Sequence, residues 1–291
     1  MFHGSLPALV TPFRDEMFDE AAFRDLVEWQ IGEGSHGLVP CGTTGEASTL
    51  DFEEHWRVVE ICVDQAAGRV PVVAGCGSNC TRSAKGNMKA AADRGADGAL
   101  CVVPYYNKPS QDGLYAHFSA LAEASDLPIL VYNVPSRTVA DISVETLGRL
   151  AAIDTIVGVK DASGNLARVS AQRIACGTDF AQLSGNDDMT LGFMAMGGVG
   201  AVSVTANVAP RLCAEFQNAC LAGEWTRALE LQDRLYPLHA ALFSDASPGP
   251  VKYALSRVRP GFPDGLRLPM SPASEASRRA VDAALEHAGL I

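Results

Sequence analysis

Eight short runs rich in Val, Ile, Leu and Ala recur along the chain, and each is followed by a polar turn and then by a longer segment of helical character. Both faces of these runs are apolar, which is typical of parallel strands that are covered by helices. The runs lie at residues 6–10, 37–41, 70–75, 99–103, 129–134, 156–160, 181–184 and 200–204. We expect each of them to form one strand of a parallel sheet.

In the segments between the runs, apolar residues recur three and four positions apart, which predicts amphipathic helices. These segments cover residues 20–31, 52–65, 82–94, 114–123, 144–150, 167–174 and 189–196, and another follows Asn207. Strict alternation of strands and helices implies right-handed βαβ units. Eight such units over about 220 residues predict an α/β fold of the (β/α)₈ TIM-barrel type, whose usual size is ~250 residues. The competing doubly wound sheet is expected to carry G-x-G-x-x-G after its first strand, and the sequence lacks that motif there.

After Pro210 the strand signal stops and the pattern becomes helical throughout. The predicted helices cover residues 211–221, 224–243, 250–258 and 274–288, with joints rich in Gly and Pro at 247–250 and 259–263. We therefore expect two domains, a catalytic barrel at residues 1–223 and a small all-helical domain at residues 224–291.

Composition narrows the choice of partners. The chain has 291 residues and a formal net charge of −11, with 34 acidic against 23 basic residues, so nucleic acid and anionic membrane surfaces are not expected partners. No apolar run approaches the ~20 residues of a membrane span, and the N-terminal segment does not read as a signal peptide, so we expect a cytoplasmic protein. The eight cysteines include no C-x-x-C pair and no cluster with His, which indicates reduced core thiols and no metal site.

In a (β/α)₈ barrel the active site lies at the carboxyl ends of the strands. Here these ends are polar and distinctive: CGTTGE at 41–46, PYYNKP at 104–109, VYNVPSRT at 131–138, GVKDASGN at 158–165, LSGNDD at 183–188 and VSVT at 202–205. The candidate chemistry therefore concentrates at one edge of the predicted barrel.

Lys160 is the sharpest chemical signal, and it is one of only five lysines. It follows Ile-Val-Gly-Val, so its amine is expected to point into the barrel mouth from an apolar strand, where burial favours the neutral form. A neutral amine in a pocket that binds a carbonyl compound is what Schiff-base catalysis requires. A lysine that forms a salt bridge with Asp161 at the end of the strand is an equally open alternative.

Two further strand ends carry groups that suit such chemistry. Tyr132 can share the inward direction of the barrel residues and shuttle protons, or it can be a core aromatic residue. Thr43 and Thr44 offer hydroxyl and N–H groups on a turn between two glycines, although such a turn also serves simply to start a helix. Arg137 lies on a predicted loop, where it can bind a carboxylate in bidentate fashion or form a surface ion pair.

The six segments CGTTGE, PYYNKPSQDGLY, YNVPSRT, GVKDASGN, SGNDD and GVGAVSVTANV, in this order and spacing, closely resemble the dihydrodipicolinate synthase family, now called 4-hydroxy-tetrahydrodipicolinate synthases. The resemblance runs almost from end to end. It implies a pyruvate-dependent, Schiff-base-forming lyase of the class I aldolase type, a carbon–oxygen lyase that condenses pyruvate with L-aspartate 4-semialdehyde on the diaminopimelate route to lysine. It further implies a homotetramer built from two tight dimers. We expect no cofactor.

The resemblance also implies roles for single residues. Lys160 matches the Schiff-base lysine and Tyr132 its proton donor and acceptor. Thr43 and Tyr106 match the other members of a proton relay, and Tyr106 is expected to reach the neighbouring subunit's site across a dimer interface. From the residues alone, the pair of Tyr106 with Tyr105 is typical of packing or of an interface.

Four more positions match the family's substrate contacts. Thr44 matches a contact to the pyruvate carboxylate, and Gly185 and Val202 match backbone or wall positions around bound pyruvate. Arg137 matches the residue that binds the carboxylate of the semialdehyde.

Members of the family that are inhibited by lysine have an allosteric site at the dimer interface, and the matching positions here are Ser48, Phe52, His55, Asn79, Ser83 and Tyr105. Ser48, His55, Asn79 and Tyr105 fit that site. At the positions of Phe52 and Ser83 a histidine and an acidic residue are expected. Without the acidic charge the effector's ammonium has no partner, so we expect weak or absent lysine feedback.

Three rival functions stay open at this point. A relative with another aldehyde partner would be an N-acetylneuraminate, 2-keto-3-deoxy sugar-acid or hydroxyproline-pathway lyase, and Arg137 argues against it. A non-catalytic barrel with a binding role predicts the loss of at least one of the four proposed catalytic residues, and none is lost. A metal-dependent aldolase needs His and carboxylate ligands at the strand ends, which offer no such set.

Overall fold

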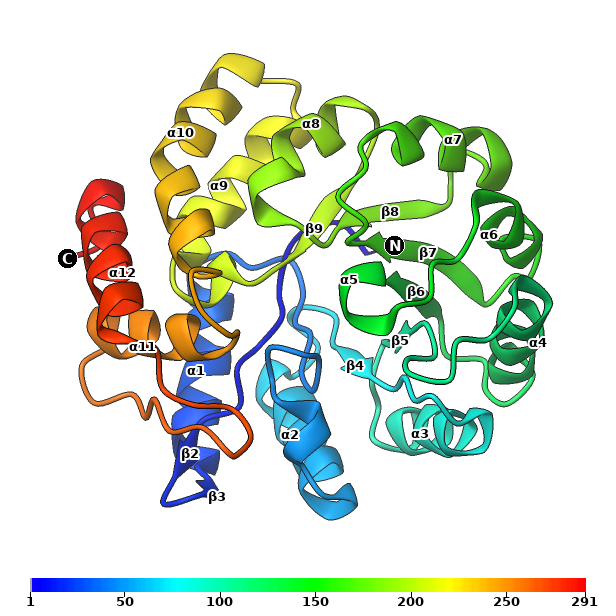
Figure 1. Ribbon diagram of the computed structural model, residues 1–291, viewed down its shortest axis with the longest axis horizontal. Helices are drawn as coiled ribbons and strands as arrows, with labels where there is room; N and C mark the ends of the chain where they lie inside the picture. The colour runs from blue at the N-terminus through cyan, green and yellow to red at the C-terminus, as the bar shows by residue number, and fades with distance from the viewer. Residues whose placement is uncertain (1) are drawn as a thin grey trace.

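The computed structural model of the protein describes residues 2–291, and its centre is a curled sheet of seven parallel strands (Figure 1). Neighbouring strands follow each other in the order β1 (Gly4–Pro7), β9 (Gly200–Ser203), β8 (Ala181–Ser184), β7 (Ile156–Asp161), β6 (Ile129–Asn133), β5 (Gly98–Val102) and β4 (Val73–Gly75). From β4 to β9, strands that follow each other in the sequence are neighbours in the sheet, and β1 lies beside β9. Such an order is that of consecutive βα units wound into a barrel, as the alternating pattern predicts.

The eighth barrel position differs from the prediction. A full strand was expected at residues 37–41, but only Leu38 and Val39 pair there, as isolated bridges to Val72 and Ala8. The N–H of Val73 donates to the Leu38 carbonyl at 2.8 Å, so this segment joins β4 to the other edge of the sheet and closes the barrel. The extended chain ends early because Cys41 adopts the left-handed region, with φ +57°.

Helices surround the strands, as Figure 1 shows. The barrel helices are α1 (Glu20–Gly32), α2 (Phe52–Ala66), α3 (Thr81–Asp93), α4 (Gln111–Ala122), α6 (Val144–Leu150), α7 (Ala167–Cys176), α8 (Thr190–Ala195) and α9 (Pro210–Leu221). All of them agree with the predicted segments to within a few residues. Elements too short for a periodic signal were not predicted: the hairpin β2 (Phe13–Arg14) and β3 (Met17–Phe18), the helix α5 (Pro135–Thr138), and the single turns η1 (Ala47–Thr49), η2 (Asp187–Met189) and η3 (Thr205–Asn207).

Successive residues of β6 enter two different apolar cores. On β6, Leu130 and Tyr132 belong to the core inside the barrel, whereas Ile129 and Val131 belong to the core between strands and helices. The inner core also contains Leu6, Val39, Val73, Leu100, Leu183 and Val202. Because strand side chains alternate between the two faces, a strand that is buried on both faces must be apolar throughout.

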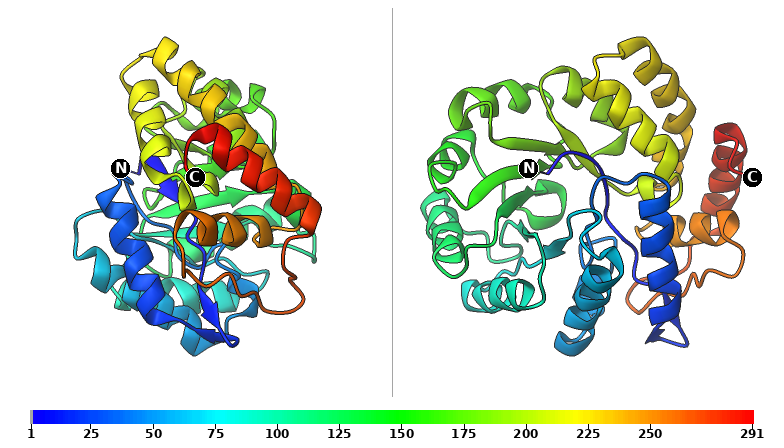
Figure 2. Two further views of the ribbon diagram at one scale, coloured as in Figure 1. Left: turned by 90° about the vertical axis from the view of Figure 1, so that its left-hand side faces the viewer. Right: turned by 180° about the vertical axis from the view of Figure 1, so that it is seen from behind.

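The C-terminal helices α10 (Trp225–Ala241), α11 (Gly249–Val258) and α12 (Glu275–Ala288) lie beside α9 and α1 at one side of the barrel (Figures 1 and 2). Leu231 and Leu285 belong to the same outer core as the barrel helices. The apolar packing is therefore continuous across Gly223, and a domain boundary at residues 223/224 stays a prediction from the sequence.

Six of the eight cysteines are buried, Cys176 is half-buried and Cys80 is exposed, so most of them are core residues as expected. No helix within residues 2–291 has the length and apolar character needed to cross a membrane. Within the same residues, no three His, Cys, Asp or Glu side chains are grouped so as to hold a metal ion.

The substitution Gly75→Ala tests how residues 37–41 and β4 close the barrel. A Cβ atom at this position would lie 1.9 Å from the Cys41 carbonyl oxygen, so we expect Gly75→Ala to lower the free energy of unfolding by about 3 kcal/mol, the upper range for overpacking. The control is Gly86→Ala on α3, where an added Cβ meets no atom within 4 Å. In that helix alanine should raise the free energy of unfolding by about 0.5–1 kcal/mol. Urea unfolding measures the free energy of unfolding of both variants. If Gly75→Ala were as stable as the parent chain, the close contact between β4 and residues 37–41 would be wrong.

Candidate active site

Lys160 and Tyr132 lie side by side inside the barrel. The register of β6 and β7 pairs Tyr132 with Lys160, and each residue is only 7% exposed. The Lys160 Nζ lies 4.1 Å from the centroid of the Tyr132 ring. Among residues 2–291 no carboxylate forms an ion pair with this amine. Lys160 is therefore a buried amine whose nearest aromatic neighbour also carries a hydroxyl group.

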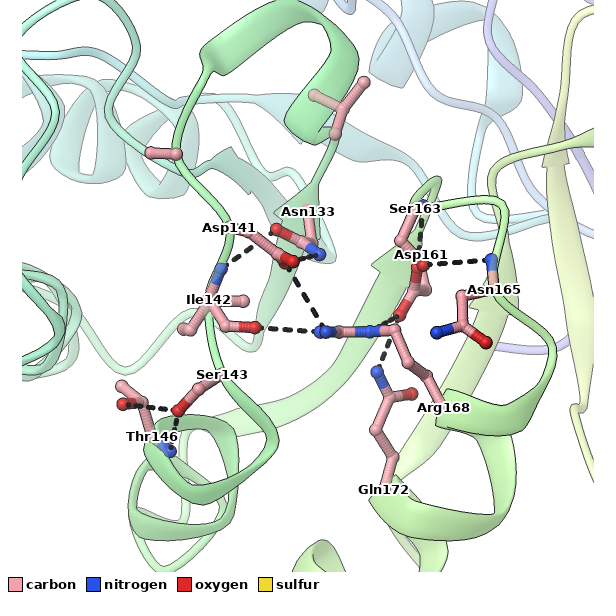
Figure 3. A network of polar contacts seen from close by, with 12 residues as sticks. Asn133, Asp141, Ile142, Ser143, Thr146, Asp161, Ser163, Asn165, Arg168 and Gln172 are labelled. Carbon is pink, nitrogen blue, oxygen red and sulfur yellow. Dashed lines mark hydrogen bonds and ion pairs between the residues drawn. The ribbon is translucent and has the colours of Figure 1, made fainter.

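Asp161 is not the partner of Lys160, so the salt-bridge alternative is wrong. Alternation along β7 directs Asp161 to the outer face, where Oδ2 accepts hydrogen bonds from Arg168 Nε at 3.0 Å and from Gln172 Nε2 at 2.6 Å. The other oxygen, Oδ1, accepts from the backbone N–H of Ser163 at 2.8 Å (Figure 3). The carboxylate is thus held by three donors on the side of the strand away from the amine.

The same network reaches the end of β6 (Figure 3). Arg168 donates to the Ile142 carbonyl at 2.8 Å and lies 3.5 Å from the carboxylate of Asp141. Asn133, which pairs with Asp161 in the sheet, donates to Asp141 at 2.8 Å and accepts from the Ile142 N–H at 3.2 Å. These contacts lock the outer face of β6 and β7 together, and thereby hold the inward side chains one position earlier in each strand.

A cavity of about 450 Å³ opens at the carboxyl ends of the strands. Of the residues predicted for catalysis and substrate binding, Thr43, Tyr132 and Arg137 line it. Among the described residues that line it, Arg137 is the only charged one and none is Asp or Glu. Since the chain as a whole carries a net charge of −11, this lining is locally suited to an anion.

The three predicted pyruvate contacts, like Lys160, are not among the residues that line this cavity. Thr44 is 5% exposed, within the turn that also carries Thr43. Gly185 follows β8 and donates its N–H to the Asp161 carbonyl at 2.7 Å. Val202 is 1% exposed and belongs to the inner core. Their direct contact with a substrate stays a prediction.

Tyr106 stands apart from the other predicted catalytic residues. Its side chain is 88% exposed, and its backbone adopts the left-handed region with φ +74°. Its neighbour Tyr105 is 41% exposed and does line the cavity. Strained backbone of this kind persists only where the surroundings impose it, and it occurs preferentially at functional sites.

Arg137 was predicted on a loop, and the structure corrects this to the short helix α5. Pro135 stands at the first position of that helix, and the Thr138 hydroxyl donates to the Val134 carbonyl at 3.1 Å. The guanidinium of Arg137 is exposed and has no carboxylate partner among the described residues. A surface ion pair is thus not its role within one chain.

The positions that match a lysine-binding site divide into two groups. Ser48, His55 and Tyr105 line the same cavity as Tyr132. The ring of His55 bonds the Gly75 carbonyl through Nε2 at 2.8 Å, and burial lowers the pKa of this histidine. The other positions lie outside the lining: Asn79, the exposed Ser83 in the first turn of α3, and Phe52, which is 66% exposed.

Two charged residues near the site were missed by the reasoning from the sequence. Glu46 ends the turn that carries Thr43 and Thr44, and it forms a buried ion pair with Lys252 of α11. Glu46 belongs to a distinctive segment, which was a usable signal. Lys252 had none, because its partner lies 206 positions away in the chain.

The chain is similar to known proteins over its whole length. A model of the "Dihydrodipicolinate synthetase family" matches residues 1–288. A protein from Rhizorhabdus wittichii named 4-hydroxy-tetrahydrodipicolinate synthase is 69% identical over 290 residues, which cover 100% of both chains.

Two solved structures share the fold. Dihydrodipicolinate synthase from Acinetobacter baumannii in complex with pyruvate has a TM-score of 0.97 and 44% identity over 100% of both chains. The enzyme from Cyanidioschyzon merolae with lysine bound has a TM-score of 0.96 and 37% identity, covering 100% of this chain and 99% of that one.

Proposed function

The chain belongs to the dihydrodipicolinate synthetase family, and we propose that Lys160 performs the family's reaction as a Schiff-base lysine. The protein is a lyase with 4-hydroxy-tetrahydrodipicolinate synthase activity in lysine and diaminopimelate biosynthesis. Its substrates are pyruvate and L-aspartate 4-semialdehyde.

One observation carries the catalytic assignment: the buried amine of Lys160 lies 4.1 Å from the Tyr132 ring centroid and has no carboxylate partner among the described residues. Because no carboxylate binds this amine, it can approach the carbonyl carbon of a substrate, as Schiff-base formation requires. The phenol beside it can donate and accept the protons that the reaction moves.

In the proposed sequence, neutral Lys160 attacks the ketone carbon of pyruvate. Tyr132 supplies the proton with which the carbinolamine oxygen leaves as water, and the resulting imine loses a methyl proton to become an enamine. The enamine carbon then attacks the aldehyde carbon of the semialdehyde. Attack by the product's own amino group on the imine closes the ring and frees Lys160.

The other predicted residues support these steps. Thr43 lines the cavity with Tyr132 and extends the proton relay. Tyr106 is proposed to complete the relay in the neighbouring subunit, which is consistent with its 88% exposure within one chain. Thr44 is assigned to the pyruvate carboxylate.

Gly185 and Val202 are assigned to the wall around bound pyruvate, and Arg137 to the carboxylate of the semialdehyde. A homotetramer of two tight dimers, and the cytoplasmic location expected from the sequence, belong to the same proposal.

Borohydride reduction tests the role of Lys160. With pyruvate present, reduction should add one reduced pyruvate per chain at Lys160, because only an imine at that amine becomes a stable secondary amine. Peptide mass mapping locates the addition. Lys108→Ala, on the loop after β5, is the control and should be labelled as the parent chain is. A folded protein that forms no adduct at Lys160 would refute the Schiff-base assignment.

Arg137 tests the assignment of the second substrate. We expect Arg137→Ala to raise KM for aspartate semialdehyde by roughly 10–100-fold, as the loss of a charged carboxylate contact does, and to leave KM for pyruvate within about twofold. A coupled assay with each substrate varied in turn measures both constants. If the semialdehyde kinetics barely change, the assignment fails and the other aldehyde partners must be tested.

The response to lysine tests the positions that match the family's lysine-binding site. No acidic side chain of residues 2–291 lines the cavity and Ser83 is uncharged, so we expect half-inhibition only above about 1 mM lysine, which corresponds to weak binding. Ser83→Glu should strengthen inhibition several-fold by supplying a partner for the effector's ammonium. Half-inhibition of the parent chain well below millimolar lysine would contradict this.

A further inference from the structure

Lys252 is a fully buried charge that the proposed reaction does not use. Its Nζ donates to Glu46 Oε1 at 2.5 Å and to the Gly265 carbonyl at 2.7 Å, and the two charged side chains are 0% and 1% exposed. The amine also lies 4.3 Å from the centroid of the Phe13 ring. Burial lowers the pKa of Lys252 to about 8, and the carboxylate of Glu46 opposes that shift.

Glu46 is rigidly connected to the turn that carries Thr43 and Thr44. Its backbone N–H donates to the Thr43 carbonyl at 3.1 Å, and its own backbone adopts the left-handed region with φ +54°. Its second carboxylate oxygen accepts the backbone N–H of Arg267 at 3.2 Å. Both carboxylate oxygens are therefore held by the C-terminal part of the chain, which links that part to the turn.

The barrel holds the same turn from its other side. The Thr11 hydroxyl donates to the Gly45 carbonyl at 2.7 Å, and a Cβ atom at Gly45 would lie 2.8 Å from the Leu9 carbonyl oxygen. The turn is thus fixed at Gly45 by the barrel and at Glu46 by α11.

A buried ion pair is a weak source of net stability, because the cost of desolvating both charges offsets their attraction. Well-packed apolar residues at both positions would stabilise a core at least as well. An ion pair also fixes the relative orientation of its two side chains, because its hydrogen bonds require a particular arrangement of donor and acceptor. The contact at Glu46 therefore suits a positioning role better than a purely stabilising one.

We propose that Glu46 and Lys252 are positioning residues, which hold the Thr43–Thr44 turn at the cavity so that it can receive pyruvate. The inference rests on the proposed function, since that function assigns Thr43 to the proton relay and Thr44 to the pyruvate carboxylate. It gives α11 an indirect part in the reaction, through the position of the turn.

Steady-state kinetics of Glu46→Gln, Lys252→Met and the double variant test the proposal. A displaced turn should raise KM for pyruvate by about tenfold or more and lower kcat, because small misplacements of a binding group are costly. KM for aspartate semialdehyde should stay within about twofold, because Arg137 is carried by a different element. A purely structural role would instead reduce the fraction of active chains, counted by borohydride trapping with pyruvate, and would leave both KM values unchanged.

The double variant separates positioning from the burial of an unpaired charge. Glu46→Gln together with Lys252→Met removes both charges, so its thermal unfolding should lie closer to that of the parent chain than either single variant does. Its KM for pyruvate should stay raised. If the single variants do not fold, the KM of the double variant for pyruvate tests the positioning role by itself.

The matched control is Arg259→Met. It breaks the ion pair with Asp25, another link between the C-terminal segment and the barrel that does not touch the turn. Both KM values should then equal those of the parent chain.

Two failures are distinguishable. If the parent chain forms a pyruvate adduct at Lys160 while the folded double variant keeps the parent KM for pyruvate, the positioning role is wrong and the proposed function stands. The positioning role is also wrong if both KM values rise equally. If the parent chain itself forms no adduct, the proposed function fails first.

Discussion

The alignment of β6 with β7 is the constraint on which the candidate site depends. It places Tyr132 beside Lys160 inside the barrel and, one residue further on, Asn133 beside Asp161 on the outer face. Because strand side chains alternate, a slip of one strand by a single residue would move every side chain to the other face. With β7 slipped in this way, the carboxylate of Asp161 would enter the barrel and Lys160 would leave it. The outer network of Arg168 therefore protects the register that the inner chemistry needs.

The two buried lysines differ in the partners of their amines. Lys252 has a carboxylate partner at 2.5 Å, whereas Lys160 has an aromatic neighbour and no carboxylate partner within residues 2–291. The first arrangement keeps a charge and gives a direction. The second leaves an amine that no carboxylate binds and that can bond to the carbonyl carbon of a substrate. Pyruvate is an anion, the semialdehyde carries a carboxylate and the net charge of the chain is −11, so attraction for a carboxylate must be created locally, where Arg137 lines a cavity that has no Asp or Glu among its described lining residues.

Periodic patterns predicted the long elements well and the short or bent ones poorly. The helix from Phe52 to Ala66 has a clear apolar stripe, and its start carries a capping box from Asp51 to Glu54. Residues 37–41 show the composition of a strand, yet the left-handed conformation of Cys41 ends the pairing after two bridges. Four residues suffice for α5, too few for a 3.6-residue period to appear, so Arg137 was placed on a loop.

The pattern of residues along the chain was enough to predict the barrel and the edge at which the candidate catalytic residues lie. The same segments carry the resemblance that assigns roles to Lys160 and Tyr132. These are properties of neighbouring residues, because apolar runs and the polar segments after them lie next to each other in the sequence. The partner of each charge is not such a property. Whether Asp161 would pair with Lys160 or with Arg168, and whether Lys252 would find Glu46 206 positions away, depended on which faces the closed barrel brings together. Only the tertiary structure decided these pairings, because the strength of an electrostatic contact depends on the distance between the two charges in space. The number of residues between them in the sequence does not indicate that distance.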